Sequence, residues 1–275
     1  MSEPMSEIGA RAALAQSVGA EAGRLALDFW RKRESLAIEA KAGLLDIVSE
    51  ADRSVERLVR DRVAAVFPQD GFLGEEYGLT EGTSGYAWVV DPIDGTSPYL
   101  FGMPNWCVSV AVAKGLDPVI GVIDAPTHGE QFAARLGGGA TLNGVALRLS
   151  PDLRIQGAAT GVGASYRTSP EWIAQVTGDL ARMGGVFFRN GSGALMLAYV
   201  AAGRLAAYLE PHMHAWDCLA GLLIIREAGG RTADYPDGGD LANGGRIIAA
   251  APGAWEDALR LMGGEREVAA QNGGV

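Results

Sequence analysis

The chain has 275 residues, which is enough to bury a large core as one α/β unit or as two modest domains. Its formal net charge of −10 repels a phosphate backbone, which disfavours a general nucleic-acid binder. The first residues carry acids where a signal peptide needs basic residues, and no run approaches the ~18 apolar residues of a membrane span, so we expect a soluble cytoplasmic protein with no membrane partner.

The first half of the chain begins with two amphipathic helices. Apolar residues recur at helical spacing from Ile8 to about Arg33, and again from about Ser49 to Val66, where Pro68 ends the pattern. Short apolar runs separated by turns then predict strands, and their short connections favour antiparallel neighbours. These predicted strands span residues 86–90, 106–113, 118–124, 130–136 and 144–149.

In the second half, helices and strands alternate. The predicted strands lie near 157–161, 185–188, 204–209 and 246–250, and the helices near 170–183, 192–202, 216–228 and from 252 onward. This alternation predicts stacked layers of helix and sheet, with no internal repeat and no long linker. We therefore expect a single unit over residues 1–275, made of a metal-binding half (1–150), a second half (151–265) and a disordered tail (266–275).

The stretch WVVDPIDGTSP delivers two carboxylates to the end of a buried strand. Because Pro92 cannot continue the hydrogen-bond ladder, we expect a turn that places Asp91, Asp94 and the Ile93 carbonyl on one rim. Hard oxygen ligands of this kind suit Mg²⁺. A simple turn stabilised by an Asp-Gly pair would account for Asp94 but not for Asp91.

The residues that follow predict the start of a helix. Thr96 or Ser97 is expected to cap it, with Pro98 at the first helical position. The free backbone N–H groups at that helix start would face an anion held by the metals. Carboxylates for cations beside amides for an anion indicate a metal-dependent phosphate site.

Further carboxylates should converge if two divalent ions bind, but each candidate also has a plainer explanation. Glu75 and Glu76, in the sequence GEE, fit a solvated surface pair. Asp217 stands in the first turn of an apolar helix, where an acid favours the helix dipole. Asp52, three residues after Ser49, fits a capping box.

Six motifs occur in a fixed order along the chain, and together they indicate a protein family far more specifically than any one motif does. They are DIVSEAD (46–52), GEE (74–76), WVVDPIDGT (88–96), NG (143–144), RNGSGALMLAYVAAGR (189–204) and HAWDCLAGLLIIREAGG (214–230). Together they resemble the inositol monophosphatase family over roughly residues 10–260. The resemblance implies an α-β-α-β-α layered sandwich, an α/β fold shared with fructose-1,6-bisphosphatase, which hydrolyses phosphate monoesters with two or three Mg²⁺ ions.

The family's pattern also implies the metal ligands. Glu75, Asp91 and the Ile93 carbonyl would hold one ion, and Asp91, Asp94 and Asp217 a second. A third, weaker ion is often associated with Glu75, which counts among the catalytic residues. One ion activates the attacking water, and the other neutralises charge on the departing alcohol oxygen.

The resemblance implies roles for residues around the metals as well. Asp52 and Thr96 would orient the attacking water, and the amides of Gly95 and Thr96 would hold phosphate oxygens. Lys41 matches a family lysine near the metal loop. Glu210, seven residues before Asp217, matches a glutamate that accepts hydrogen bonds from substrate hydroxyls.

Departures from the family pattern concern substrate specificity, that is, the alcohol part of the phosphate ester, rather than the metal ligands. In the segment RNGSGALM, Met196 stands where the family commonly has an acidic residue, and Gly193 where it has alanine. We expect Gly191, Ser192 and Gly193 to contact the substrate together with Asp217. The metal ligands are intact, so the open question is which alcohol is preferred.

The leading expectation is a cytoplasmic phosphoric monoester hydrolase acting on myo-inositol 1-phosphate, assembled as a homodimer and inhibited by Li⁺, as many relatives are. Histidinol phosphate is the nearest alternative; fructose 1,6-bisphosphate and 3′-phosphoadenosine 5′-phosphate are less favoured. Some relatives act as regulators bound to RNA or to the transcription apparatus, but the acidity and the full ligand set disfavour that as the sole role.

Groups outside the metal motifs are not required for this chemistry. Metal-activated water needs no covalent nucleophile, so His128, His212 and His214 need not be catalytic. The two cysteines, Cys107 and Cys218, each lie in an apolar run, which predicts reduced and buried thiols.

Overall fold

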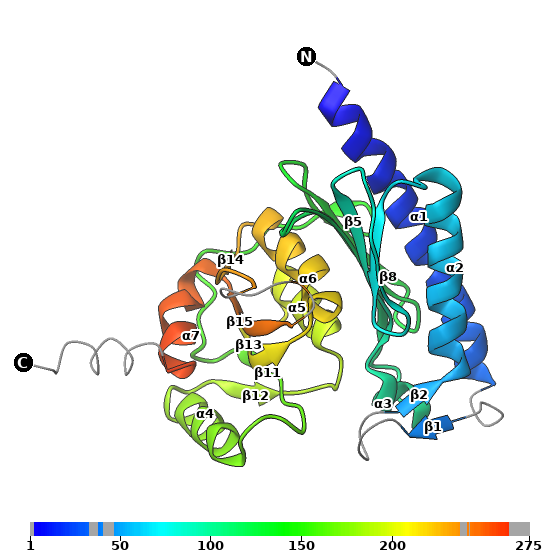
Figure 1. Cartoon of the computed structure of the whole chain (residues 1–275). Helices are drawn as coiled ribbons and strands as arrows, with labels where there is room; N and C mark the ends of the chain where they lie inside the picture. Colours follow the sequence, from blue (N-terminus) through cyan, green and yellow to red (C-terminus); the bar gives the residue numbers. More distant parts are fainter. Residues whose placement is uncertain (1–2, 33–37, 41–46, 237–240, 242, 264–275) are drawn as a thin grey trace, which may run out of the picture.

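The computed structural model describes residues 3–32, 38–40, 47–236, 241 and 243–263. Layers of helix and sheet alternate through the molecule in the order α-β-α-β-α, which confirms the expected α/β sandwich (Figure 1). The helices of the three α layers are, from the N-terminal side, α1 (Glu3–Arg31) with α2 (Glu50–Val66), then α5 (Gly193–Ala201) with α6 (Ala215–Glu227), then α4 (Pro170–Arg182) with α7 (Trp255–Leu261). A short helix, α3 (Thr96–Leu100), and a 3-10 turn, η2 (Pro252–Ala254), complete the helical elements of the described residues.

The first β layer is an eight-stranded sheet with the strand order β10-β9-β8-β7-β6-β5-β3-β4. Its neighbours pair antiparallel, as their short connections predict, except that β3 and β5 are parallel. The strands are β3 (Gly71–Gly74), β4 (Gly78–Thr80), β5 (Tyr86–Asp94), β6 (Cys107–Lys114), β7 (Asp117–Ala125), β8 (Glu130–Arg135), β9 (Gly139–Leu142) and β10 (Val145–Ala146).

Two parts of this sheet differ from the sequence prediction. The hairpin of β3 and β4 has no counterpart among the predicted strands, because both of its strands are short and contain glycine. The strand expected at 144–149 is reduced to β10, which pairs with β9 across Asn143 and Gly144. Both of these residues have positive φ, 49° and 78°, which suits a tight hairpin turn.

The second β layer is a five-stranded sheet with the order β12-β11-β13-β15-β14. Strand β11 is parallel to both of its neighbours, whereas β15 is antiparallel to both of its own. The strands are β11 (Ala159–Val162), β12 (Val186–Phe188), β13 (Ala207–Met213), β14 (Arg231–Thr232) and β15 (Gly245–Ala250), and a separate pair is formed by β1 (Ile38–Ala40) and β2 (Ile47–Ser49).

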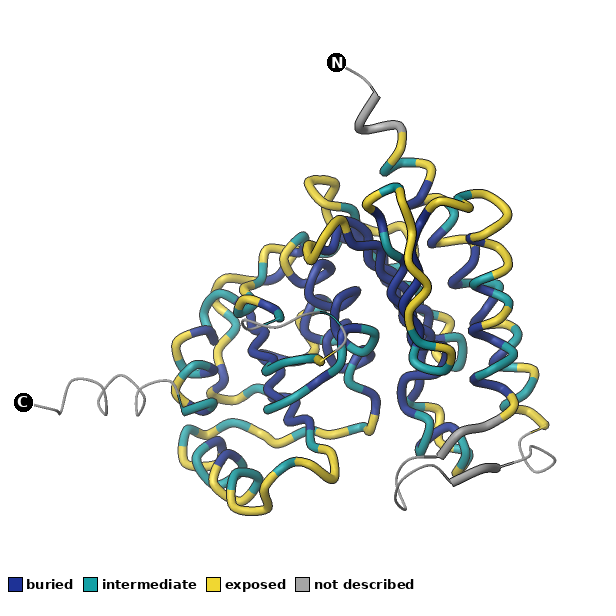
Figure 2. The backbone as a smooth tube through the Cα atoms, in the orientation of Figure 1, coloured by how far each residue is buried: buried dark blue, intermediate teal, exposed yellow. Residues whose placement is uncertain are grey.

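Buried apolar residues form two cores, which follow the layers (Figure 2). One lies between α1, α2 and the eight-stranded sheet, and the other surrounds α5 and α6 between the two sheets. Cys107 and Cys218 are free and buried in this second core, as predicted. Along the described parts of the chain, no helix combines the length and apolar character that a membrane crossing needs.

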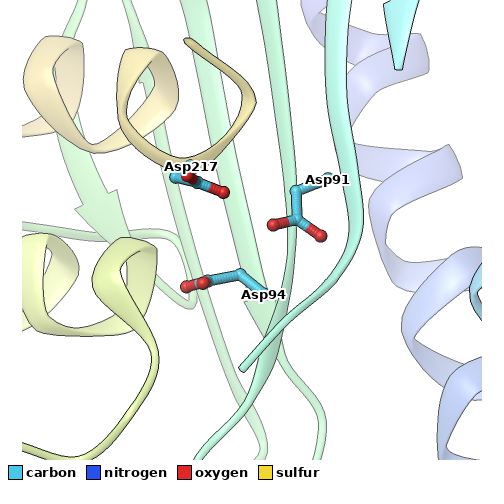
Figure 3. A group of neighbouring side chains, drawn as sticks. All are labelled: Asp91, Asp94 and Asp217. Carbon is cyan, nitrogen blue, oxygen red and sulfur yellow. The ribbon is translucent and has the colours of Figure 1, made fainter. Parts of the chain in front are cut away.

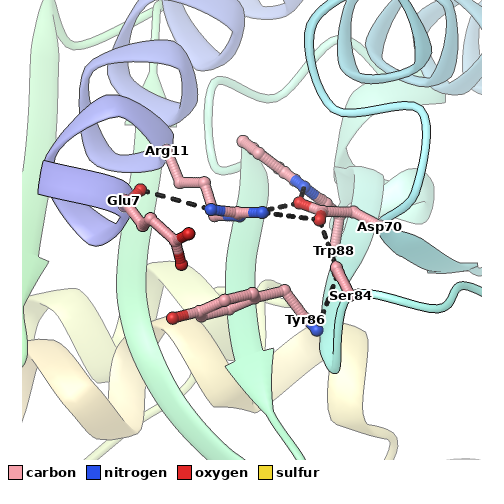
Figure 4. Close-up of polar contacts among 6 residues, drawn as sticks. All are labelled: Glu7, Arg11, Asp70, Ser84, Tyr86 and Trp88. Carbon is pink, nitrogen blue, oxygen red and sulfur yellow. Dashed lines mark hydrogen bonds and ion pairs between the residues drawn. The ribbon is translucent and has the colours of Figure 1, made fainter. Parts of the chain in front are cut away.

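A buried polar network fastens α1 to the sheet (Figure 4). The Arg11 guanidinium makes a two-pronged ion pair with Asp70, with Nη2–Oδ1 and Nε–Oδ2 distances of 2.7 and 2.8 Å. Trp88 Nε1 and Ser84 Oγ donate to the same carboxylate at 2.9 and 2.6 Å. Arg11 also stacks 4.1 Å above the Tyr86 ring. The Asp70 carboxylate and this ring together compensate the charge of the guanidinium within the core.

Candidate metal and phosphate site

Strand β5 carries Asp91 and Asp94 past Pro92 without the expected turn. The pairing between β5 and β6 shifts register between Asp91 and Asp94, so Pro92 lies in an irregular part of a continuing strand. The predicted turn is therefore wrong, because a bulge accommodates the missing proline N–H. In a regular strand residues three apart face opposite sides, so it is the irregularity that brings both carboxylates to one side.

Asp217, from the first turn of α6, completes a cluster with these two residues (Figure 3). One carboxylate oxygen of each of Asp91, Asp94 and Asp217 lies within 4.8 Å of the others. Asp217 Oδ2 also accepts a hydrogen bond of 3.3 Å from the backbone N–H of His214 at the helix start. Asp217 therefore both supports the start of α6 and contributes to the cluster.

The cluster is electrostatically unfavourable without a cation. Burial raises the pKa of Asp91 well above its ordinary value, and the charges of Glu75, Asp94 and Asp217 raise it further. Burial and the charge of Asp94 raise the pKa of Asp217 to about 7. Three carboxylates that oppose one another's ionisation form an oxygen-rich donor set of the kind that Mg²⁺ favours, so these residues fit a divalent cation.

Asp94 is also bound to the start of α5. Ser192 Oγ and the backbone N–H of Ala194 donate to its Oδ2 at 2.5 and 2.7 Å, and the Gly193 N–H lies 3.3 Å from its Oδ1. Ser192 caps the same helix by accepting from Leu195 N at 3.3 Å. The structure thus joins Ser192 and Gly193 to a carboxylate of the cluster, while their contact with a substrate stays a prediction.

The chain after Asp94 enters α3 in a way that differs from the prediction. Gly95, not Thr96 or Ser97, is the N-cap, and Thr96 occupies the first helical position expected for Pro98. Gly95 has φ of 93°, and a Cβ there would lie 2.8 Å from the Asn105 carbonyl oxygen, so both conformation and space require glycine. Thr96 Oγ1 donates to the Ile93 carbonyl at 3.1 Å instead of capping the helix.

Two neighbouring cavities collect most of the predicted site residues. One is lined by Asp94, Asp217, Glu210, Gly191 and Gly193 among others. The second is lined by Glu75, Gly95 and Thr96, and shares Gly191 with the first. Because the two cavities share lining residues, the predicted residues that line them border one continuous region of the surface, whereas Asp91, Ile93 and Ser192 line neither cavity.

Glu210 reaches the first cavity from β13. This strand runs through Pro211 to Met213 with a register shift after Glu210. The predicted strand near 204–209 therefore ends too early, because a bulge accommodates Pro211 as another accommodates Pro92. Tyr208 Oη donates a 2.5 Å hydrogen bond to Glu210 Oε2. Burial raises the pKa of Glu210 to about 8, although the bond from Tyr208 opposes that shift.

Three predicted site residues, Glu75, Asp52 and Lys41, are not members of the three-carboxylate cluster. Glu75 is not a member of the three-carboxylate group among the described residues, although its charge acts on Asp91. Asp52 is buried in the first turn of α2, and its charge raises the pKa of Tyr99 further after burial has raised it. Lys41 lies outside the described residues.

Two arginines that the sequence did not single out line both cavities. Arg167 Nη1 lies 3.0 Å from His214 Nε2, and Arg189 Nη2 donates to the Ala164 carbonyl at 2.8 Å. Their charges act to lower the pKa values of Asp217 and Glu210, respectively. They come from separate loops with no periodic pattern, so only the family motif around Arg189 could have drawn attention to one of them.

Comparison with known proteins places these features in a family. The chain matches the model of the inositol monophosphatase family over residues 10–262. It is 38% identical to inositol-1-monophosphatase of Rhizobium meliloti (strain 1021), covering 86% of this chain and 89% of the relative. It is 36% identical to Nus factor SuhB of Escherichia coli (strain K12), covering 90% and 92%. Among solved structures, the extragenic suppressor protein suhB from Bartonella henselae matches with a TM-score of 0.86 and 31% identity, covering 92% of this chain and 98% of that chain.

Proposed function

Because the chain belongs to the inositol monophosphatase family, we propose that it is a Mg²⁺-dependent phosphatase that hydrolyses myo-inositol 1-phosphate to inositol and phosphate in the cytoplasm. The observation that carries this proposal is the convergence of Asp91, Asp94 and Asp217 within 4.8 Å beside a cavity. The name of the Rhizobium meliloti relative supports the choice of substrate. Two free, buried cysteines agree with a reducing compartment.

In this proposal the carboxylates would bind two divalent ions. Asp91, Asp94 and Asp217 would hold one divalent ion, and Glu75 with Asp91 and the Ile93 carbonyl would hold another. When bound, the ions supply positive charge to the phosphate and acidify a neighbouring water. The Asp94 carboxylate keeps its orientation because it is hydrogen-bonded at the start of α5.

Residues around the carboxylates would position the water and the phosphate. The hydroxyl proton of Thr96 is used on the Ile93 carbonyl, so its oxygen is available to accept a hydrogen bond from the attacking water. Asp52 would accept a second hydrogen bond from that water and fix its orientation. The amides of Gly95 and Thr96 border the cavity and would donate to phosphate oxygens.

The charge of the cavity favours a neutral polyol over a cationic alcohol. Glu210 would accept hydrogen bonds from substrate hydroxyls, and it could equally pair with the ammonium of histidinol phosphate. Arg167 and Arg189 line the same cavity, however, and their positive charges oppose an ammonium group. This contrast ranks myo-inositol 1-phosphate above histidinol phosphate.

A second candidate role follows from the Nus factor SuhB relatives, such as the Escherichia coli protein at 36% identity. The formal net charge of −10 disfavours direct contact with RNA, so such a role would rest on protein partners. Co-purification of the tagged chain with the transcription apparatus tests it.

Assembly as a homodimer also belongs to the proposal, and light scattering of the purified protein tests that assembly.

A phosphate-release assay tests the enzymatic proposal. The panel contains myo-inositol 1-phosphate, histidinol phosphate, fructose 1,6-bisphosphate and adenosine 2′-monophosphate, each with Mg²⁺ and with EDTA. We expect the highest kcat/KM for myo-inositol 1-phosphate, no turnover in EDTA, and inhibition by millimolar Li⁺. Preference for histidinol phosphate would overturn the substrate assignment, and turnover in EDTA would overturn the metal-dependent reaction.

A further inference from the structure

Glu56 is a fully buried carboxylate that lies outside the three-carboxylate cluster. It stands one helical turn after Asp52 on α2. Its Oε2 accepts a hydrogen bond of 2.7 Å from the backbone N–H of Glu76, and its Oε1 accepts one of 3.3 Å from the N–H of Tyr77. A buried carboxylate bound to two consecutive amides fixes the path of the turn that contains them.

The glycine of the GEE sequence makes room for this carboxylate. A Cβ on Gly74 would lie 2.1 Å from Glu56 Oε1 and 2.3 Å from Glu56 Cδ, which is far inside van der Waals contact. Gly74 does not have a positive φ, so its requirement is one of space rather than of backbone conformation. Glycine at this position therefore allows Glu56 to reach the amides on the far side of the turn.

Arg60 extends the same contact along the hairpin of β3 and β4. Its Nε donates to Glu56 Oε1 at 2.8 Å, and its Nη2 and Nη1 donate to the Gly78 carbonyl and to Thr80 Oγ1 at 2.6 and 3.0 Å. Its guanidinium also lies 4.2 Å from the centre of the Phe72 ring. Both strands and the turn between them are thereby fastened to one face of α2.

Glu75 lies in this turn, directly before the amides that bind Glu56. On its other side, the Glu75 N–H donates to the carbonyl of Val90, the residue before Asp91, at 3.3 Å. The backbone of Glu75 is thus held between β5 and α2. Because Asp52 and Glu56 are four residues apart on α2, they share one helix face, and the helix sets the positions of Asp52 and Glu75 together.

We propose that Glu56 is a positioning residue for Glu75, fixing the β3–β4 turn so that the Glu75 carboxylate faces Asp91 and can take part in binding Mg²⁺. The inference rests on the proposed function in one respect, namely that Glu75 is a metal ligand. It assigns to Glu56 a role in cation affinity in addition to its contribution to folding. Outer partners that orient ligands commonly affect metal affinity by about 10–100-fold.

The test is a double-mutant cycle read by calorimetric titration of the metal-free protein with Mg²⁺. Glu56→Gln keeps the side-chain size but replaces an acceptor oxygen with a donor facing the amides. We expect it to weaken Mg²⁺ binding about 10-fold or more. In a Glu75→Gln background the same change should have no further effect, because it acts through Glu75. The control is Glu21→Gln, which breaks a Glu–Arg pair between α1 and α2 away from the turn and should leave the affinity unchanged.

Unfolding curves and a second variant keep the inference falsifiable. If Glu56→Gln does not fold, Gly74→Ala displaces the same carboxylate from the opposite side and should reproduce the loss of affinity. Wild-type affinity in a folded Glu56→Gln or Gly74→Ala protein, or equal losses with and without Glu75, would overturn the inference. A wild-type protein that binds Mg²⁺ but hydrolyses no phosphate would instead overturn the proposed function and leave the role of Glu56 standing.

Discussion

The hydroxyl of Ser192 donates a 2.5 Å hydrogen bond to the Asp94 carboxylate, joining residues that lie 98 positions apart in the chain. Ser192→Ala removes this bond and the side-chain cap of α5, so we expect the free energy of unfolding to fall by about 1–3 kcal/mol. Mg²⁺ affinity should fall as well, because Asp94 loses a partner that orients it. Urea unfolding with and without Mg²⁺ measures both effects. Ser169→Ala, which removes the N-cap of α4 away from the site, should lower stability without changing Mg²⁺ affinity.

Asp91→Asn should abolish most turnover while the protein stays folded. Asp91 is the carboxylate proposed to be shared by both ions, so an amide in its place removes one negative ligand from each. Because the charges of Glu75, Asp94 and Asp217 oppose ionisation of Asp91, the metal-free variant should be at least as stable as the wild type. Phosphate release and thermal unfolding in EDTA test the two statements. Near wild-type turnover in this variant would contradict the two-metal proposal.

Glu210→Gln should raise KM for the true substrate more than it lowers kcat. A carboxylate that accepts hydrogen bonds from substrate hydroxyls equally in the ground and transition states contributes mainly to binding. Above pH 8, where Glu210 is ionised, we expect a loss of about 1–3 kcal/mol in kcat/KM, the range for hydrogen bonds to a charged group. Tyr208→Phe, which removes only the bond to Glu210, should have a smaller effect. An unchanged kcat/KM for every phosphate would mean that Glu210 does not contact the substrate.

Asp124 should make the protein less stable as the pH rises. It is buried on β7, and burial raises its pKa to about 6, although a hydrogen bond from Gln131 Nε2 opposes that shift. The protonated form is therefore favoured by folding. Its stabilising contribution is complete below the ordinary carboxyl pKa of 3.8 and is lost as the pH rises through about 6.

Asp124→Asn tests this pH dependence, because the amide stays neutral at every pH. The variant should match the wild type near pH 4 and exceed it by up to about 2 kcal/mol above pH 7. Denaturant unfolding at both pH values measures the difference. An equal difference between variant and wild type at pH 4 and pH 8 would show that Asp124 does not change protonation in this range.

The ion pair of Arg11 and Asp70 should contribute strongly to the stability of the fold. Asp70→Asn leaves the Arg11 guanidinium buried without a charged partner, which costs about 3–5 kcal/mol. Hydrogen bonds from Arg11, Ser84 and Trp88 lower the pKa of Asp70 although burial opposes them. Its contribution is therefore present above the ordinary carboxyl pKa and is lost as the pH falls through the lowered value.

A surface pair offers the comparison for this prediction. Arg62 and Glu21 also join α1 to α2, but their side chains are 54% and 32% exposed. Glu21→Gln should therefore cost less than about 1 kcal/mol. Urea unfolding of both variants gives the two values, and equal losses would mean that burial of the Arg11 pair adds nothing.

The features that local patterns encode could be predicted from the sequence. The periodic helices and the strands with clear boundaries lie close to their expected positions, and the Asp residues of DPIDGT and HAWD do converge. The turn predicted at Pro92 and the strand end predicted near residue 209 are wrong, because pairing across a bulge tolerates a proline that a regular ladder excludes. Neither the bond of Ser192 to Asp94 nor that of Glu56 to the Glu76 amide could be predicted, since both depend on tertiary packing.

The position of the three carboxylates between two layers has a consequence for the lifetime of the protein. Asp91 and Asp94 belong to the eight-stranded sheet, and Asp217 belongs to a helix between the sheets, so their mutual repulsion acts where the layers meet. A cation bound there at 100 times its dissociation constant would add about 2.7 kcal/mol to stability by mass action. Chains that have not acquired the ion would open between these layers more often and be degraded sooner. The supply of Mg²⁺ would then govern how much of the protein persists as well as how fast it works.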